Sequence, residues 1–193
     1  GLATQWAVDA ADKTKWVFKL RPGVKFHDGS ALTADAVVWN VEKVLKKDAA
    51  HFDPSQVGLT VSRMPTLRSA RKIDDLTVEL TTSEPDSFLP INLTNLYMAS
   101  PAHWAAKLAA VPASVTDPAE RAKQAWVAFA SDPSGSGPFR GVRLQPRERF
   151  EMVANKSYWD PVRTPKIDRV VLIPLADSNA RTAALLSNQV DWI

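Results

Sequence analysis

The hydrophobic period of the chain changes between residues 16 and 45, and this change limits the folds that the chain can adopt. Residues 16–20 place Trp16, Phe18 and Leu20 on one face, and this period of two is typical of a half-buried strand. Along residues 34–47, apolar residues recur at helical spacing, which predicts an amphipathic helix. Strands interleaved with such helices predict an α/β fold.

The remaining elements follow from the same two periods. Residues 48–66 contain Pro54, Gly58 and Pro65, so we expect them to be irregular. The apolar, β-branched run at 168–174 is typical of a buried central strand. Further strands are predicted at 67–73, 76–80, 139–144 and 150–154, and further helices at 101–110, 118–130 and 177–188. The predicted core consists of Phe18, Leu20, Val37, Val41, Val78, Leu80, Val170, Leu172 and Leu185.

Composition excludes several classes of protein. Apolar residues make up 45% of the 193 residues, which is enough to form a sizeable core. Cysteine is absent, so disulfide scaffolds, thiol catalysis and zinc sites built on cysteine are excluded. The net charge is +3 and the positive residues are spread along the chain, whereas a nucleic-acid interface needs them clustered on one face. No apolar run approaches the roughly 18 residues of a membrane-spanning helix.

None of the polar motifs forms a recognisable catalytic or metal-binding set. His27, His51 and His103 lie far apart in sequence without helical partners, and we expect His27 to be a half-exposed turn residue. The segment Gly135-Ser136-Gly137 is too short for a nucleophile elbow or a phosphate loop. Asp74-Asp75 is typical of a hairpin turn. We therefore expect no catalytic residue, no metal site and no cofactor.

Three apolar residues are candidates for a ligand cavity. Trp39 lies on the opposite side of its predicted helix from the valine stripe, and Tyr97-Met98 lies in an apolar stretch shortly before Pro101. Aromatic and methionine side chains near irregular backbone can line a binding cavity. The alternative, that they pack between layers of the fold, stays open from the residues alone.

Six stretches of the sequence resemble one known family. Residues 16–29 (WVFKLRPGVKFHDG) with 32–37 (LTADAV) resemble the signature of solute-binding protein family 5, the extracytoplasmic binding proteins of bacterial ABC importers. Residues 73–80 resemble that family's hairpin, and 135–139 (GSGPF) with the following NKSYW resemble its glycine turn. The segment from Asp177 to Asp191 resembles a further element of the family.

This resemblance implies a two-lobed periplasmic-binding-protein fold with an extra inserted subdomain. It places residues 1–32 and 135–193 in the first lobe and residues 33–134 in the smaller inserted α/β subdomain. Members of the family are much longer, so we expect this chain to be a piece that lacks the second lobe and the removed signal peptide. A single lobe is expected to bind its solute weakly.

The resemblance also implies a function. It predicts the substrate-binding component of an ABC importer, a periplasmic or cell-surface monomer that captures a di- or oligopeptide, a nickel complex or another solute for membrane permease subunits, with no role for nucleic acid. It places Tyr97 and Met98 where members of the family approach the ligand, and Gly135, Ser136 and Gly137 close to the junction of the lobes. Trp39 is a third ligand-binding candidate, from its place on the predicted helix alone. The alternative is the effector-sensing domain of a transcriptional regulator with a similar fold.

Overall fold

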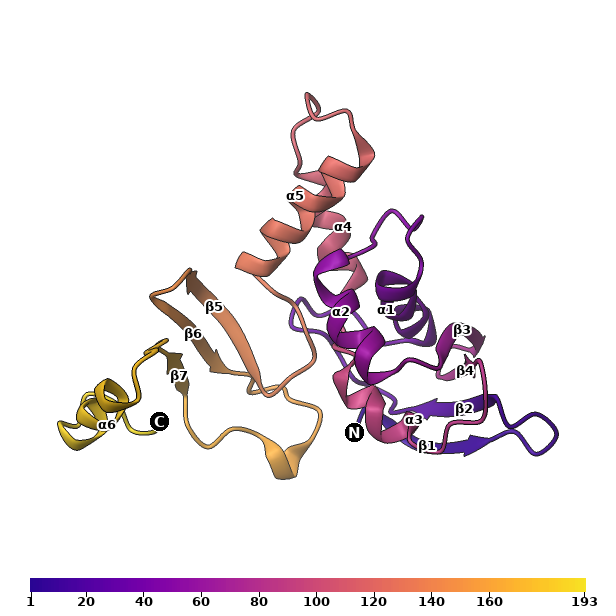
Figure 1. Cartoon of the computed structure of the whole chain (residues 1–193), viewed down its shortest axis with the longest axis horizontal. Coiled ribbons are helices and arrows are strands. Elements are labelled where there is room, and N and C mark those ends of the chain that lie inside the picture. Colours follow the sequence, from indigo (N-terminus) through magenta and orange to yellow (C-terminus); the bar gives the residue numbers. More distant parts are fainter.

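A computed structural model describes residues 1–193, and it contains two antiparallel sheets with separate sets of helices (Figure 1). The first sheet has the order β1-β2-β4-β3 and the second the order β5-β6-β7. The strands are β1 (Ala3–Val8), β2 (Lys15–Leu20), β3 (Leu67–Asp74), β4 (Thr77–Thr82), β5 (Phe139–Gln145), β6 (Arg149–Ala154) and β7 (Arg169–Leu172). The helices are α1 (Ala34–Leu45), α2 (Pro54–Arg63), α3 (Leu89–Asn92), α4 (Pro101–Ala109), α5 (Pro118–Ser131) and α6 (Ser178–Leu186), with the short 3₁₀ turns η1 (Leu93–Asn95) and η2 (Pro161–Arg163).

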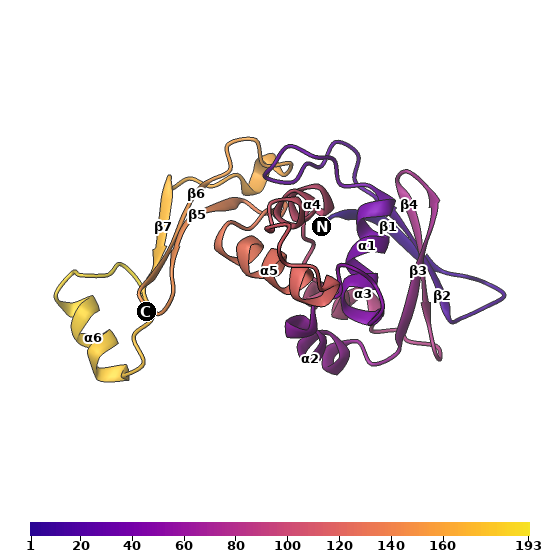
Figure 2. The same cartoon turned by 90° about the horizontal axis from the view of Figure 1, so that it is seen from above.

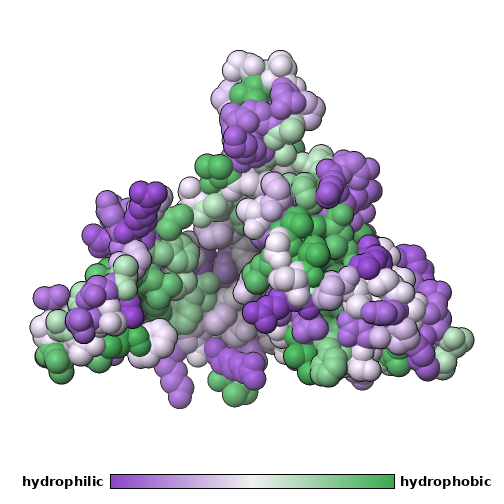
Figure 3. Space-filling view, in the orientation of Figure 1, coloured by the Kyte–Doolittle hydropathy of each residue, from purple (hydrophilic) through white to green (hydrophobic).

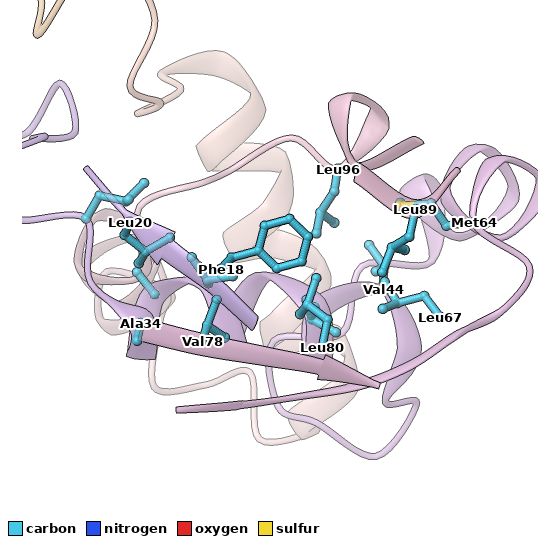
Figure 4. Packing of buried hydrophobic residues seen from close by; sticks show 14 of the residues in the cluster. Phe18, Leu20, Ala34, Val44, Met64, Leu67, Val78, Leu80, Leu89 and Leu96 are labelled. Atoms are coloured by element: carbon cyan, nitrogen blue, oxygen red, sulfur yellow. The ribbon is translucent and has the colours of Figure 1, made fainter. Parts of the chain in front are cut away.

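The first sheet carries the main core on the face that α1 covers (Figure 2). The inward residues of β2 and β4 meet the valine stripe of α1, and Leu89 and Leu96 close the core from the segment after β4 (Figure 4). This cluster contains 16 buried residues. The predicted core residues Phe18, Leu20, Val37, Val41, Val78 and Leu80 all belong to it, so these six predictions are confirmed.

Helix α1 begins where the sequence predicts. Thr33 has extended backbone angles, and its Oγ1 accepts a hydrogen bond of 3.3 Å from the N–H of Ala36. Asp35 adds a negative charge in the first turn, where the helix dipole favours it. The helix ends at Leu45, two residues before the predicted end.

Helix α2, strand β1 and the short helical segments α3 and η1 were not predicted. Residues 48–66 were expected to be irregular, but α2 occupies much of this range. Asp53 caps α2 by accepting from the N–H of Ser55, and Pro54 fits the first turn because its missing N–H would have no partner there. Strand β1 pairs with β2 at the edge of the first sheet, and its side chains are mostly exposed, so no burial pattern marked it.

The second sheet departs from prediction in its burial. Its three strands form as expected, but β7 lies at the edge of the sheet and is not a buried central strand. Leu172 is 47% exposed, Leu185 is also exposed and Val170 is only half-buried, so these core predictions are wrong for this chain. The reason is that no layer packs over this face. Only Glu151 and Ala184 are buried beyond residue 134.

Helices α4 and α5 pack against each other and project away from the first sheet and its helices (Figure 1). Their contact holds a second, smaller cluster that includes Trp104, Ala125 and Phe129. No helix in the structure is both long enough and apolar enough to cross a bilayer.

The predicted division of the chain into residues 1–32 with 135–193, and residues 33–134, stays a prediction. Within this chain, β2 pairs with β4, so strands from the first and second of these segments share one sheet and one core. The two sheets are separated instead by α4, α5 and the segment from Asp132 to Pro138.

Candidate functional site

A cavity of about 750 Å³ lies on the apolar side of the first sheet. Strands β1, β2 and β4 form its floor, and residues 90–98 and 135–137 form its walls. Apolar surface lies on both sides of the hollow between the two halves of the molecule (Figure 3). The lining residues are Gly1, Leu2, Ala3, Trp6, Phe18, Leu20, Val37, Val78, Leu80, Pro90, Leu93, Thr94, Leu96, Tyr97, Met98, Gly135, Ser136 and Gly137.

This cavity brings together most of the residues that the sequence singles out. Tyr97 and Met98 lie on one wall and Gly135, Ser136 and Gly137 on the other. Tyr97 is 62% exposed, whereas Met98 is half-buried and packs against the main core. None of the lining side chains is charged, so this surface offers apolar contact and a few hydroxyl groups.

Trp39 lies apart from the cavity. Its ring stacks on His51 with 4.4 Å between ring centroids and also meets Trp104 and Trp126 of the α4–α5 pair. Burial lowers the pKa of His51, in keeping with its place among these rings. The structure therefore separates Trp39 from Tyr97 and Met98, and it places this residue between packed helices.

Buried polar residues of α1 hold the wall that carries Tyr97. The Asn40 side chain donates to the carbonyl of Ala99 over 2.9 Å and accepts from the N–H of Ala99 over 2.8 Å. One turn later, the Lys43 Nζ donates to the carbonyl of Tyr97 over 2.9 Å. Because Asn40 and Lys43 are completely buried, these contacts fix the backbone of the wall while leaving the Tyr97 ring free.

Lys43 is an unusual group to find in a core. Burial lowers its pKa to about 8, and the nearby carboxylate of Asp53 acts in the opposite direction. Its ammonium group also lies 5.9 Å from the ring centre of Trp126. From the sequence, Lys43 was predicted to lie near the end of α1, where positive charge is favourable, but its burial was not predicted. The position of Asn40 and Lys43 on the core-facing side of an apolar helix could have indicated that both are buried.

The second wall is held by residues that sequence reasoning assigned to a simple turn. The backbone N–H of His27 donates to the carbonyl of Gly135 over 2.8 Å, and the His27 ring lies within hydrogen-bond distance of the carbonyl of Gly137. The backbone N–H of Asp28 donates to Ser134 Oγ over 3.1 Å. His27 is half-buried as predicted, but its contacts reach more than 100 residues along the chain.

The two walls also contact each other. The N–H of Ser100 donates to the carbonyl of Ser134 over 2.9 Å, and Ser100 Oγ donates to the Asp28 carboxylate over 2.6 Å. Burial tends to raise the pKa of Asp28, but hydrogen bonds from Ser100 and Ser30 outweigh this effect and the pKa is lowered. Asp28 therefore links the two walls, through its carboxylate to Ser100 and through its backbone N–H to Ser134.

A second cavity, of about 660 Å³, lies between residues 47–55 and helix α5. None of the predicted ligand or junction residues lines it. No group of three or more histidine, cysteine or acidic side chains is arranged to hold a metal ion anywhere in the structure.

Comparison with known proteins gives matches over the whole chain. Residues 1–193 match the family model described as bacterial extracellular solute-binding proteins, family 5 Middle. The chain is 30% identical to the glutathione-binding protein GsiB of Pectobacterium atrosepticum, over 95% of this chain and 31% of that protein. It is 28% identical to di/tripeptide-binding protein 1 of Pseudomonas aeruginosa, over 98% of this chain and 35% of that protein.

A solved structure shows the same fold. The periplasmic binding protein DppA of Helicobacter pylori, in complex with the peptide STSA, superposes with a TM-score of 0.78 at 24% identity, covering 98% of this chain and 36% of that one. The chain thus spans about a third of the length of the proteins that it matches.

Proposed function

This chain belongs to family 5 of the bacterial extracellular solute-binding proteins, and on that premise we propose that it supplies one wall of the solute cleft in the substrate-binding component of an ABC importer. The family consists of binding proteins and not of enzymes. The proposed protein captures a peptide or a related small solute outside the cytoplasm, as a monomer, and delivers it to permease subunits in the membrane.

The cavity beside Tyr97 and Met98 is the observation that carries this proposal. It gathers two segments that lie far apart in sequence, and both are held by buried or partly buried polar contacts. A preformed cavity with a mainly apolar lining is typical of small-molecule sites. We propose that Tyr97 and Met98 contact the solute from one side and that Gly135, Ser136 and Gly137 contact it from the other. Trp39 is not part of this proposal, because it packs away from the cavity.

The lining also bears on the kind of solute. Without a charged side chain on these walls, this part of the site favours an apolar group of the solute, such as a hydrophobic side chain of a peptide. The relatives named above bind glutathione and di- or tripeptides by name, and peptides contain both apolar and charged groups. Charged groups of the solute are then recognised outside this cavity.

The alternative function, effector sensing within a transcriptional regulator, has no support from the relatives, which are named as binding proteins. The importer component is therefore the function proposed.

The test is to identify and titrate the solute in the full-length protein. Mass spectrometry of the protein purified from its host identifies any co-purified solute, and calorimetry then compares Met-Leu, Glu-Glu, glutathione and Ni²⁺. We expect binding of a peptide, with Met-Leu bound more tightly than Glu-Glu. Tyr97→Ala should weaken binding by about 1 kcal/mol, or roughly fivefold, because an aromatic contact is lost.

Phe88→Ala is the matched control. Phe88 is an exposed aromatic residue close to Tyr97 in sequence, but it does not line the cavity. Equal affinities for the two variants would contradict the placement of the solute at Tyr97. Binding of none of the four probes, with no co-purified solute, would contradict the proposed function.

A further inference from the structure

The imidazole of His27 lies in the turn that forms the second wall of the cavity. Its Nδ1 lies 3.3 Å from the backbone N of Gly135, and its Nε2 lies 2.9 Å from the carbonyl oxygen of Gly137. With the bond from the His27 N–H to the Gly135 carbonyl, one residue makes three hydrogen bonds to a turn that is remote in sequence.

These contacts define the protonation of the ring. A backbone N–H can only donate, so Nδ1 must accept from Gly135 and carries no hydrogen. A carbonyl can only accept, so Nε2 must donate to Gly137 and carries the hydrogen. The two contacts are satisfied together only by the neutral ring with its hydrogen on Nε2.

We propose that His27, in this neutral form, is a positioning residue of the solute site that fixes the backbone of residues 135–137 on the cavity wall. This inference rests on the proposed function, because it takes the cavity to be the solute site.

The packing of Gly135 shows what this positioning achieves. A Cβ atom at Gly135 would lie 3.6 Å from the carbonyl oxygen of Met98 and 4.0 Å from the Cε1 of His27. The turn is therefore held between the His27 ring and the opposite wall. A shift of the ring would change the distance between the two walls that we assign to the solute.

The carbonyl groups of residues 135–137 have partners within the chain, so this turn can interact with a solute only as a hydrogen-bond donor. The carbonyl of Ser136 accepts from Trp159 Nε1 over 3.1 Å, and the carbonyl of Gly137 also accepts from Asn155 Nδ2 over 3.1 Å. All three carbonyls of residues 135–137 are thus engaged within the chain, whereas the N–H groups of Ser136 and Gly137 make no hydrogen bond in the structure. The turn fixed by His27 can therefore donate to an uncharged carbonyl oxygen of a solute, such as that of a peptide bond.

Asp28 extends this arrangement to the first wall. Its backbone contacts Ser134 and its carboxylate accepts from Ser100, which follows the Tyr97 segment. Residues 27 and 28 therefore contact both walls. The Asp28 carboxylate, the charged group nearest to the His27 ring in sequence, already accepts hydrogen bonds from Ser30 and Ser100. The guanidinium of Arg21 lies 5.0 Å from the ring centre of Trp159, the residue that donates to the carbonyl of Ser136.

Two substitutions separate the two contacts of the ring. His27→Asn retains an acceptor near the position of Nδ1, and His27→Gln retains a donor near the position of Nε2. His103→Gln is the matched control, because the His103 ring also meets a backbone carbonyl, that of Asp132, but does not line the cavity.

The first readout is amide hydrogen exchange at Gly135, measured by NMR on the full-length protein. Loss of one hydrogen bond is worth about 1 kcal/mol, so His27→Gln should speed this exchange by about fivefold, whereas His27→Asn and His103→Gln should leave it nearly unchanged. The nitrogen chemical shifts of the unaltered protein, recorded at alkaline pH, should show Nδ1 of His27 without hydrogen. A hydrogen on Nδ1, or equal exchange in all variants, would overturn the proposal.

The second readout is the affinity for Met-Leu. We expect His27→Gln to weaken it by about fivefold, His27→Asn to weaken it less, and His103→Gln to leave it unchanged. Unchanged affinity in His27→Gln, with faster exchange at Gly135, would overturn the role of His27 in binding but not the proposed function. Failure of the unaltered protein to bind any probe would instead count against the proposed function.

Discussion

The first sheet, β1-β2-β4-β3, and the second sheet, β5-β6-β7, differ in what covers them. Helix α1 packs on the first sheet and seals a cluster of 16 buried residues. The second sheet has no such helix on its face, and the apolar residues Val142, Leu144, Val171, Leu172 and Ile173 remain exposed. The one buried residue of this second sheet is the charged Glu151, and the only other buried residue beyond residue 134 is Ala184 of α6. Alternating strands are thus enough to form a sheet, but burial needs a second layer.

The largest expected difference between the two sheets is in the free energy of unfolding. Leu80→Ala removes a side chain that is 2% exposed, and it should lower that free energy by about 2–5 kcal/mol. Leu172→Ala, at a corresponding apolar position of the exposed sheet, should change it by less than about 0.5 kcal/mol. Denaturant titrations followed by circular dichroism measure both. A cost for Leu172→Ala equal to that of Leu80→Ala would show that the second sheet is covered in solution.

The buried lysine of the first half should give a pH dependence. The pKa of Lys43 falls from 10.5 to about 8 on folding, so the unfolded state binds this proton more tightly. The cost of holding the charged form is therefore fully present below pH 8. It is relieved as pH rises from about 8 to 10.5, where the free energy of unfolding should increase by up to about 3 kcal/mol.

Lys43→Met should remove this rise, whereas Lys46→Met, on the exposed end of the same helix, should retain it. Stability measured by denaturant titration across this pH range separates the two variants. Identical pH profiles for the Lys43→Met variant and the unaltered protein would show that Lys43 is solvated.

Asparagine side chains allow a comparison of polar contacts in the two halves. Asn40→Ala leaves the buried N–H and carbonyl of Ala99 without these partners, and this should cost about 1–3 kcal/mol. Asn155→Ala removes a bond to Gly137 from a half-buried side chain, where water can replace it, and should cost less than about 1 kcal/mol. Thermal unfolding of the two variants measures the difference. A larger cost at Asn155 would mean that the turn of residues 135–137 is better sealed than the structure indicates.

The smallest expected difference between the two sheets concerns their charged residues. Glu151 is in contact with Arg169 and lies 3.5 Å from Arg149 and 4.0 Å from Arg143. Because these arginines are about half-exposed, Glu151→Gln should cost only about 1 kcal/mol at low salt, and less at 1 M salt, where the screening length is about 3 Å.

Glu79→Gln, which removes the partner of Arg71 in the first sheet, is the control for this comparison. We expect its effect to be smaller, about 0.5 kcal/mol, because the apolar core supports that sheet. Hydrogen exchange of the strand amides at low and high salt reports on each sheet separately. If Glu151→Gln had the same effect at both salt concentrations, its contacts would be more deeply buried than in this structure.

Local sequence patterns were enough to predict where most elements lie and which of their faces are apolar. The Thr33 cap and the valine stripe predicted α1 to within two residues, and the alternation in residues 16–20 and 76–80 predicted β2, β4 and their buried sides. These features are local, since a side chain's face follows from the backbone period alone. The resemblance of residues 16–29 to the solute-binding family was confirmed over the whole chain.

Which of these faces are covered, and which distant residues meet, follows from the packing of the whole chain and not from any local pattern. Leu172 lies in an apolar run that predicts burial as clearly as the alternation around Leu80, but Leu172 is exposed, because burial depends on a neighbouring layer that the local pattern does not contain. His27 lies beside Gly135 because the chain between them folds back on itself, and no spacing in the sequence marks a contact of that range. Lys43 is buried because the Tyr97 carbonyl is placed to receive it, and a buried charge is tolerated only where such a partner exists.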